Sequence, residues 1–466
     1  MTWSQRLGGL DAMFLYIEDR TAHMHVGAVA VFEGRPPDYA DLVGHIASRL
    51  DRAPRYRQRL AFVPFQLGRP VWIDDGNLDL EYHVRHTALP APGGPEPLKR
   101  LAARVFSQRL DRDRPLWELW LVEGLGPDRF ALLSKTHHCM LDGVSGADLA
   151  TVLLGTDPAE VRPGAAASWA PRPAPGPAKL VASALLDQAT HPLQLVRSAL
   201  RPDGPGRQKL LELGAGLKPL VGLSRLGRAR ASSLNRPIGP HRRWEMALLD
   251  LDRVKAVRAA LGGTVNDVLL SVIAGALRRL FLSRGEEPPV DVRAMIPVSV
   301  RAPGTSGELG NRVTAVFCAL PTGEEDAAER LRSVSAEMDV LKESGQAVGA
   351  LAWTHLGEFA PPAVLAQAAR FQSTFRYMNL VVTNIPGPRE PIYLLGRRML
   401  EWYPLVPLAQ GQTLGVAIQS YAGRIGIGLL GDAEALRDLP ALAAAIPAAL
   451  AELEEIAARR PATRSP

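Results

Sequence analysis

A segment rich in proline, alanine and glycine interrupts the chain between Arg162 and Pro177, with the sequence RPGAAASWAPRPAPGP. Such a composition does not support a helix or a strand, because proline lacks a backbone donor and glycine is too free. The segment therefore predicts a linker, and the 466 residues exceed what a single core usually organises. We expect folded domains at residues 1–160 and 243–466, joined by a basic connection at 161–242 that contains amphipathic helices.

Both expected domains mix strand-like and helix-like stretches. In the first, HVGAVAVFE (His25–Glu33) indicates a strand and YADLVGHIASRL (Tyr39–Leu50) a helix. In the second, strands are expected at Val290–Val300, Asn311–Leu320, Met378–Asn384, Thr413–Tyr421 and Arg424–Leu430, with helices near 324–343 and 361–376 and from Ala433 to Arg459. The pattern predicts an α/β fold for each domain.

Positive charge is concentrated around the linker. The net charge is +6, yet residues 161–243 carry fourteen Lys and Arg against three acids. An anionic partner is expected there, and since no nucleic-acid motif and few aromatics occur, a membrane surface is favoured over nucleic acid. The helix-compatible stretches within 178–230 lie on a membrane or pack between the domains, and the sequence leaves both interpretations open.

The expected location follows from cysteine usage and hydropathy. Cys139 and Cys318 are the only cysteines, which excludes a disulfide framework and fits a reducing cytoplasm. The chain has no basic segment followed by an apolar run at its start and no stretch of eighteen apolar residues. We expect a cytoplasmic protein that neither spans a membrane nor is exported, and that associates peripherally with the inner face of the membrane or with lipid inclusions.

The chemical centre is expected where the apolar strand Phe130–His137 runs through a short loop into a helix opened by Ser145. His138 then projects from the end of a strand, just before a helix N-terminus, which is where α/β proteins bind ligands. An imidazole with a pKa near ~6.5 can remove a proton from an attacking hydroxyl. His138 is therefore the candidate general base.

Three other interpretations compete at this place. A metal site would use His137, His138 and Asp142, but adjacent residues on a strand point to opposite faces, so we expect no metal and no bound cofactor. A dyad of Cys139 with the adjacent His138 is disfavoured for the same reason. For an isolated pair, two buried and hydrogen-bonded histidines would be the better interpretation.

The wider pattern favours function. The heptapeptide His137-His138-Cys139-Met140-Leu141-Asp142-Gly143 resembles the HHxxxDG motif of the wax ester synthase/diacylglycerol acyltransferase family, within the superfamily of chloramphenicol acetyltransferase and condensation domains. The blocks LDAMFLYIE, HMHVGA and PLW before it, and GGTVNDVLL, RAMIPVSVR, LGNRV and NLVVTNIPGP after it, resemble family blocks in the expected order. The resemblance covers nearly the whole chain; Gly8-Gly9 departs from the family's usual Ser-Pro pair.

This resemblance implies two chloramphenicol acetyltransferase-like domains, each a mixed sheet flanked by helices, with an active-site channel at their interface. It implies transfer of a long-chain acyl group from acyl-CoA, a co-substrate, to diacylglycerol or a long-chain alcohol, without a covalent intermediate. Two alternatives remain open. One is a related acyltransferase that uses a carrier-protein donor or a polyketide-type alcohol; the other is a non-catalytic lipid-binding protein.

The resemblance also implies roles for individual residues. His138 is the base and His137 supports it. Asp142 holds the loop, with Arg293 as a candidate partner, and Gly143 either lets the backbone approach the acyl channel or forms a turn. Asn266 matches the second family motif.

The residues around these motifs have two interpretations each. Thr264 and Asp267 form a helix cap, which places Asn266 in the first turn, where amide groups suit an oxyanion. Trp117 packs in the core or lines the channel, while Thr383 and Asn384 border the site or form a turn. His23 and His25, which share one strand face, touch the site or sit in a satisfied pocket, and the second is favoured.

Overall fold

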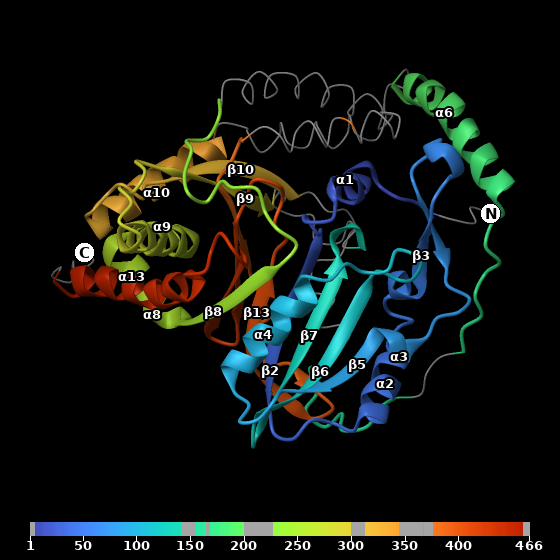
Figure 1. Cartoon of the computed structure of the whole chain (residues 1–466), viewed down its shortest axis with the longest axis horizontal. Helices are drawn as coiled ribbons and strands as arrows, with labels where there is room; N and C mark the ends of the chain where they lie inside the picture. The colour runs from blue at the N-terminus through green and yellow to red at the C-terminus, as the bar shows by residue number, and fades with distance from the viewer. Residues whose placement is uncertain are drawn as a thin grey trace.

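Two six-stranded mixed sheets carry the chain (Figure 1). The computed structural model describes residues 5–140, 154–164, 168–199, 227–299, 313–343, 367 and 376–459. In spatial order the first sheet contains β12 (Tyr393–Leu394), β13 (Arg397–Leu405), β2 (His25–Glu33), β7 (Arg129–His137), β6 (Trp117–Gly126) and β5 (Val84–Ala88). The second contains β10 (Val313–Leu320), β9 (Val292–Ser299), β11 (Leu380–Ile385), β14 (Leu414–Tyr421), β15 (Arg424–Asp432) and β8 (Arg242–Asp250).

Helices and a small third sheet complete the described fold. The small sheet orders β1 (Gln5–Arg6), β4 (Val71–Asp74) and β3 (Gln58–Ala61). The α-helices are α1 (Gly9–Ile17), α2 (Tyr39–Ala47), α3 (Leu80–His83), α4 (Pro95–Phe106), α6 (Pro177–Ala199), α8 (Leu251–Leu261), α9 (Val265–Ser283), α10 (Ala327–Glu343) and α13 (Leu439–Arg459). Three short 3-10 turns are η1 (Pro54–Arg57), η2 (Pro64–Gln66) and η3 (His138–Met140). The expected α/β architecture with two mixed sheets is confirmed.

The strands that the sequence predicted are present, with ends that differ by a few residues. The strand His25–Glu33 has the expected limits, and β7 extends the expected Phe130–His137 by one residue. The last helix begins at Leu439 rather than Ala433, because Asp432 accepts backbone hydrogen bonds in the turn before it and Pro440 suits a first helical turn. Most of the helix expected at 361–376 lies outside the described residues.

The proline-rich segment is described in part. Residues 162–164 and 168–176, its described part, contain neither helix nor strand, and α6 begins at Pro177. Within the described ranges, no single helix has the length and hydropathy needed to span a membrane, and the α8–α9 pair that together would is bent by 99°.

Both sheets are covered by apolar side chains on their inner faces. Alternation along β2 sends Phe32 to one face of the first sheet and Val29 to the other. In the second half, α9 and α13 lie against the second sheet and bury one large cluster (Figure 1). The cluster on the α4 side of the first sheet also contains Trp244 and Leu430 from the second, so one apolar core runs between the two halves.

A strand from the second half of the chain joins the first sheet, which the sequence analysis did not predict. β13 lies beyond the linker, yet it pairs antiparallel with β2 and adds an edge to the first sheet. The three contiguous ranges expected from the sequence therefore do not describe which residues build which sheet. β13 also crosses β15, where Gly426 and Gly428 face the carbonyl oxygens of Trp402 and Pro404. A Cβ atom at either glycine would lie 1.8 Å from that oxygen.

We expect Gly428→Ala to lower the free energy of unfolding by about 3 kcal/mol, because the added methyl group meets a backbone atom that can move only with its whole strand. Chemical denaturation of the purified chain measures this loss. Gly126→Ala is the matched control, since a Cβ there meets nothing within 4 Å. Equal stability of the two variants would contradict the close crossing of β13 and β15.

Candidate active site

His138 stands where a central strand ends. β7 pairs with β2 on one side and β6 on the other, and its last residue is His137. The chain then turns into η3, with the His137 N–H donating to Leu116 O at 2.9 Å and the His138 N–H donating to Met24 O at 2.8 Å. The backbone at His137 and at His138 is thus fixed by hydrogen bonds to neighbouring segments, and the two imidazole rings contact different side chains.

The His138 ring is neutral and makes no hydrogen bond to another described side chain. It stacks on Phe14 of α1 with ring centroids 3.8 Å apart and keeps part of its surface exposed. Burial lowers the pKa of His138 to about 4, reinforced by repulsion from His137 when that ring is protonated and opposed by a hydrogen bond to its own backbone. Nδ1 is buried, and no other described residue forms a hydrogen bond with it. A neutral imidazole is able to accept a proton.

A buried carboxylate lies behind this ring. The Glu18 side chain, at the end of α1, is 2% exposed, and its oxygens lie 3.5 Å from His137 Nε2 and 3.6 Å from His25 Nε2. Arg112 forms a close ion pair with it, and Arg109 Nε lies 3.6 Å away. Burial alone would raise the pKa of Glu18, but the hydrogen bonds and charges of His137 and Arg112 outweigh it and lower this pKa to about 2.

These contacts determine the protonation of His137. Its Nδ1 accepts a hydrogen bond from the Cys139 N–H at 3.1 Å, so the proton of a neutral ring resides on Nε2, which faces Glu18. Burial lowers the pKa of His137, while Glu18 opposes that effect. His137 is therefore held in one orientation next to His138, donating from Nε2 toward Glu18, and its supporting role stays a prediction.

Glu18 and Arg112 belong to this cluster and were not expected from the sequence, whereas contact with the site was the less favoured of two interpretations of His25. Glu18 ends the block LDAMFLYIE, where it drew no attention of its own. His25 lies opposite His137 in the strand register, with ring centroids 5.9 Å apart, so it touches the cluster. The favoured interpretation of a satisfied pocket fits His23 instead, whose Nε2 lies 3.1 Å from Arg20 O.

A second group of expected residues meets at the start of α9. Thr264 and Asp267 form the expected capping box, with hydrogen bonds of 3.2 and 2.8 Å. Asn384 Nδ2, at the end of β11, donates to Asn266 Oδ1 at 3.0 Å, and Thr383 precedes it on the strand. This bond orients the Asn266 amide so that its NH₂ group remains a donor. No hydrogen bond joins the pair to His138 among the described residues.

The remaining expected residues lie in the core or outside the described ranges. Trp117 is 2% exposed, donates from Nε1 to Tyr56 O at 2.9 Å and stacks on His83. This placement agrees with core packing, and its role toward substrate stays a prediction. Asp142 and Gly143 lie outside the described residues, and the Arg293 guanidinium donates to the carbonyls of Gly227 and Tyr377.

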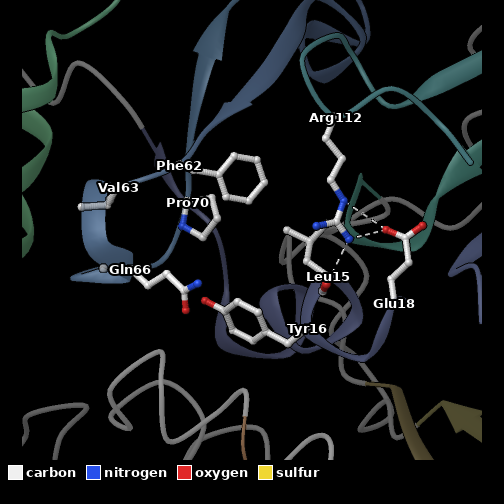
Figure 2. A pocket seen from close by; sticks show the side chains of 9 residues that line it. Leu15, Tyr16, Glu18, Phe62, Val63, Gln66, Pro70 and Arg112 are labelled. Atoms are coloured by element: carbon white, nitrogen blue, oxygen red, sulfur yellow. Dashed lines mark hydrogen bonds and ion pairs between the residues drawn. The ribbon is translucent and has the colours of Figure 1, made fainter. Parts of the chain in front are cut away.

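A cavity of about 310 Å³ borders the Glu18 cluster. Figure 2 shows Glu18 and Arg112 on one side of it, joined by their ion pair, and Phe62 and Gln66 from the β3–β4 hairpin on the other. Leu15 and Tyr16 of α1 add apolar and hydroxyl surface. In the part of the chain that is described, no three His, Cys, Asp or Glu side chains are grouped so as to hold a metal ion.

We expect the free energy of unfolding to fall as the pH is lowered from 7 to 5. Burial lowers the pKa of His23, His25, His83, His137 and His138 in the folded protein. Below the unfolded value near 6.5 only the unfolded chain takes up these protons, so stability decreases with falling pH until the folded pKa is reached. For His138, at about 4, the loss over this window is about 2 kcal/mol. Denaturant titrations at both pH values test this; a stability unchanged between them would contradict the buried neutral rings.

Known proteins are similar over nearly the whole chain. The family model of the wax ester synthase/diacylglycerol acyltransferase catalytic domain matches residues 7–269, and that of the WS/DGAT C-terminal domain matches residues 309–454. Two probable diacylglycerol O-acyltransferases of Mycobacterium tuberculosis are similar. The first, tgs1, is 35% identical over 471 residues, covering 98% of this chain and 97% of that protein. The second, tgs2, is 35% identical over 457 residues, covering 96% and 98%.

Solved structures share the fold. The wax ester synthase/diacylglycerol acyltransferase from Marinobacter aquaeolei VT8 superposes with a TM-score of 0.68 at 29% identity, covering 97% of this chain and 100% of that one. The first condensation domain of the CDA synthetase gives a TM-score of 0.59 at 18% identity over 98% and 97%, a likeness of fold alone. This chain belongs to the wax ester synthase/diacylglycerol acyltransferase family and is an acyltransferase of lipid metabolism.

Proposed function

We propose that this chain transfers a long-chain acyl group from acyl-CoA to the hydroxyl of diacylglycerol or of a long-chain alcohol, as a step of storage-lipid synthesis. The observation that carries the proposal is His138, a neutral imidazole at a strand end whose nitrogens no other described side chain engages. The name diacylglycerol O-acyltransferase given to relatives at 35% identity supports the acceptor class.

The proposed reaction needs no covalent intermediate. His138 takes the proton of the acceptor hydroxyl while the oxygen attacks the thioester carbonyl. The tetrahedral oxyanion then collapses, the carbon–sulfur bond breaks, and the CoA thiolate takes the proton from His138 or from water. His137, fixed by Glu18 and the Cys139 N–H, holds the strand end in place and does not transfer a proton.

Asn266 is the proposed oxyanion donor, because Asn384 orients its amide at the first turn of α9. We expect Asn266→Ala to lower kcat about 10²-fold with little change in KM, since the donor acts on charge that exists only in the transition state. Steady-state kinetics with acyl-CoA measure both constants. Asn77→Ala changes an exposed asparagine far along the chain and should leave them unaltered; an unaltered kcat for Asn266→Ala would exclude this role.

We propose roles in the same reaction for the other expected residues. We propose a channel between the two domains in which acyl-CoA and the acceptor meet at His138 from opposite ends. Thr383 and Asn384 border it, Gly143 lets the backbone approach the acyl chain, and Asp142 holds the loop between His138 and the following helix. Trp117 supports the wall from the core beside His83.

The proposed location is the cytoplasmic face of the membrane or the surface of lipid inclusions. The basic character of residues 161–243 supports it, with fourteen Lys and Arg against three acids. Both substrates carry long apolar chains, so an enzyme attached to lipid meets its acceptor without drawing it through water.

Incubation of the purified chain with radiolabelled acyl-CoA, with diacylglycerol and a long-chain alcohol both offered, tests the proposal. Thin-layer separation of the extracted lipids should show label in triacylglycerol, wax ester or both. Transfer only from an acyl carrier protein, or only to a polyketide-type alcohol, would show that the proposed substrates are wrong, while the proposed active site would stand. A protein that binds the lipids and transfers nothing would be the non-catalytic alternative, and the proposal would be wrong.

A further inference from the structure

An apolar patch projects from the small sheet and from the helix beside it. Phe65, in the turn between β3 and β4, is 91% exposed, and Phe62 at the end of β3 is 44% exposed. Leu185 and Leu186 on α6 are 50% and 63% exposed. These four residues (Phe62, Phe65, Leu185 and Leu186) are here called the apolar tip. Exposure of large apolar side chains to water is unfavourable, so the apolar tip indicates a binding surface.

The backbone holds Phe65 outward in a strained conformation. Phe65 has φ 56 and ψ 16, and Gln66 follows with φ 56, a left-handed region that side chains rarely adopt. Two adjacent residues other than glycine in this region keep such strain only where the surrounding structure imposes it. Pro64 before them and the buried Val63 fix the turn. The ring is therefore presented to solvent by the fold and is not left there by chance.

α6 packs against the same hairpin with one apolar face and exposes other apolar side chains to solvent. Leu180 packs on Val71 and Ile73 of β4, and Ala184 is buried over Gly68. The ion pair of Asp187 with Arg6 ties the next turn to β1. Leu185 and Leu186 follow Ala184 directly and point away from this contact. Figure 1 shows α6 beside the hairpin, and Gln188 of the helix donates to the Leu67 carbonyl of the turn, so the exposed leucines lie on a helix fixed to the hairpin.

The chemistry of the hairpin favours an anionic lipid surface over a protein partner. Residues 54–75 contain Arg55, Arg57, Arg59 and Arg69 against Asp74 and Asp75, a net charge of +2, although Arg57 is buried and Arg59 pairs with Asp75. Phenylalanine and leucine beside arginine match the interfacial layer of a bilayer, where rings enter the acyl boundary and guanidinium groups stay among phosphates. A soluble protein partner would need a defined complementary shape, whereas an isolated ring at 91% exposure needs only a fluid apolar layer.

The cavity next to the Glu18 cluster links this surface to the site. Phe62, Gln66 and Gly68 of the hairpin line one end of it, and Glu18 and Arg112 lie at the other. Phe62 therefore belongs both to the apolar tip and to the cavity wall (Figure 2). A hairpin immersed in lipid would open this cavity toward the acyl layer, which holds the acceptor.

We propose that the apolar tip inserts into the interfacial layer of an anionic phospholipid membrane and that the acceptor lipid enters through the adjoining cavity. The role of the cavity rests on the proposed acyltransferase function; the insertion does not. The proposal thus places the membrane contact at the β3–β4 hairpin and the first half of α6.

Sedimentation of the full chain with vesicles tests the insertion without any assay of activity. One set of vesicles is phosphatidylcholine alone, and the other is phosphatidylcholine with an equal amount of phosphatidylglycerol. We expect the wild type to bind the anionic set more tightly, and Phe65→Ser with Leu186→Ser to weaken that binding about tenfold or more, since two inserted side chains return to water. Leu282→Ser, which changes a leucine 52% exposed on α9, is the matched control and should bind as the wild type does.

The outcomes separate this surface from the proposed reaction. His138→Ala should sediment with vesicles as the wild type does. Loss of acyl transfer with intact vesicle binding would therefore bear on the proposed reaction and not on the proposed insertion. Undiminished binding by the double variant would overturn the insertion, as would equal binding of the wild type to both vesicle sets or to neither. Leu185→Ser together with Phe62→Ser provides an independent second variant with the same expected direction. Thermal unfolding of each variant verifies that the fold is kept.

Discussion

Replacement of His138 by alanine or glutamine is expected to lower kcat/KM for acyl transfer from acyl-CoA by at least about 10³-fold. Removing a positioned general base costs about 10²- to 10⁴-fold, and the large end applies because an alcohol at neutral pH has no other means of losing its proton during attack. Glutamine preserves a polar group near Phe14 but has no basic nitrogen. Initial rates with diacylglycerol and with a long-chain alcohol measure the loss.

His86→Ala is the control for this experiment. His86 is an exposed histidine on β5 paired with Glu123, and its removal should leave the rate near that of the wild type. Denaturant unfolding of both His138 variants at pH 7 should show one cooperative transition, so that a lost rate reports the missing base and not a lost fold. Near-normal transfer by either His138 variant would end the proposal.

Glu18→Ala is expected to lower the free energy of unfolding by about 3 kcal/mol. A carboxyl whose pKa falls from 4.5 to about 2 on folding contributes about that much at neutral pH. Its loss leaves His137 and His25 buried and facing two arginines without a counter-charge. We choose the lower end of what breaking a buried pair costs, about 3 to 5 kcal/mol, because Arg112 and Arg109 are 30% and 41% exposed and can reach water. Denaturation at pH 7 gives the value.

Two further variants serve as controls. One separates the effect of the Glu18 charge from that of its side-chain size, and the other compares a buried carboxylate with an exposed one. Glu18→Gln keeps the size of the side chain, so its difference from the wild type should shrink as the pH falls from 4.5 toward 2, where the folded protein loses the contribution of the ionised carboxylate. Glu454→Ala removes a surface carboxylate with two hydrogen bonds to Arg253 and should cost less than about 1 kcal/mol. Similar losses for Glu18→Ala and Glu454→Ala would show that the buried cluster is not held by Glu18.

Local pattern was enough to predict much of the fold. The run HVGAVAVFE alternates small and large apolar residues in a way that a strand buried on both faces requires, and its limits were predicted without error. The capping box of Thr264 and Asp267 was predictable because both partners lie within one turn of each other. Such features depend only on residues near in sequence.

Features that depend on distant residues could not be predicted in the same way. β13 joins β2 although more than half the chain separates them, and nothing in RRMLEWYPL indicates which sheet it extends. Glu18 gains its importance from Arg112 and His137, which only the fold brings together. The expected base, His138, was identified through a motif, whereas the carboxylate that fixes its neighbour had no local signal.

The path of β13 has a consequence for how the protein is made. When the first half of the chain leaves the ribosome, β2 still has a free edge, and that edge stays open until residue 405 has been synthesised. Open strand edges invite association between nascent chains. Separately expressed halves should therefore aggregate unless they are mixed during refolding. In the completed molecule the two halves can separate only if β13 loses its hydrogen bonds to β2.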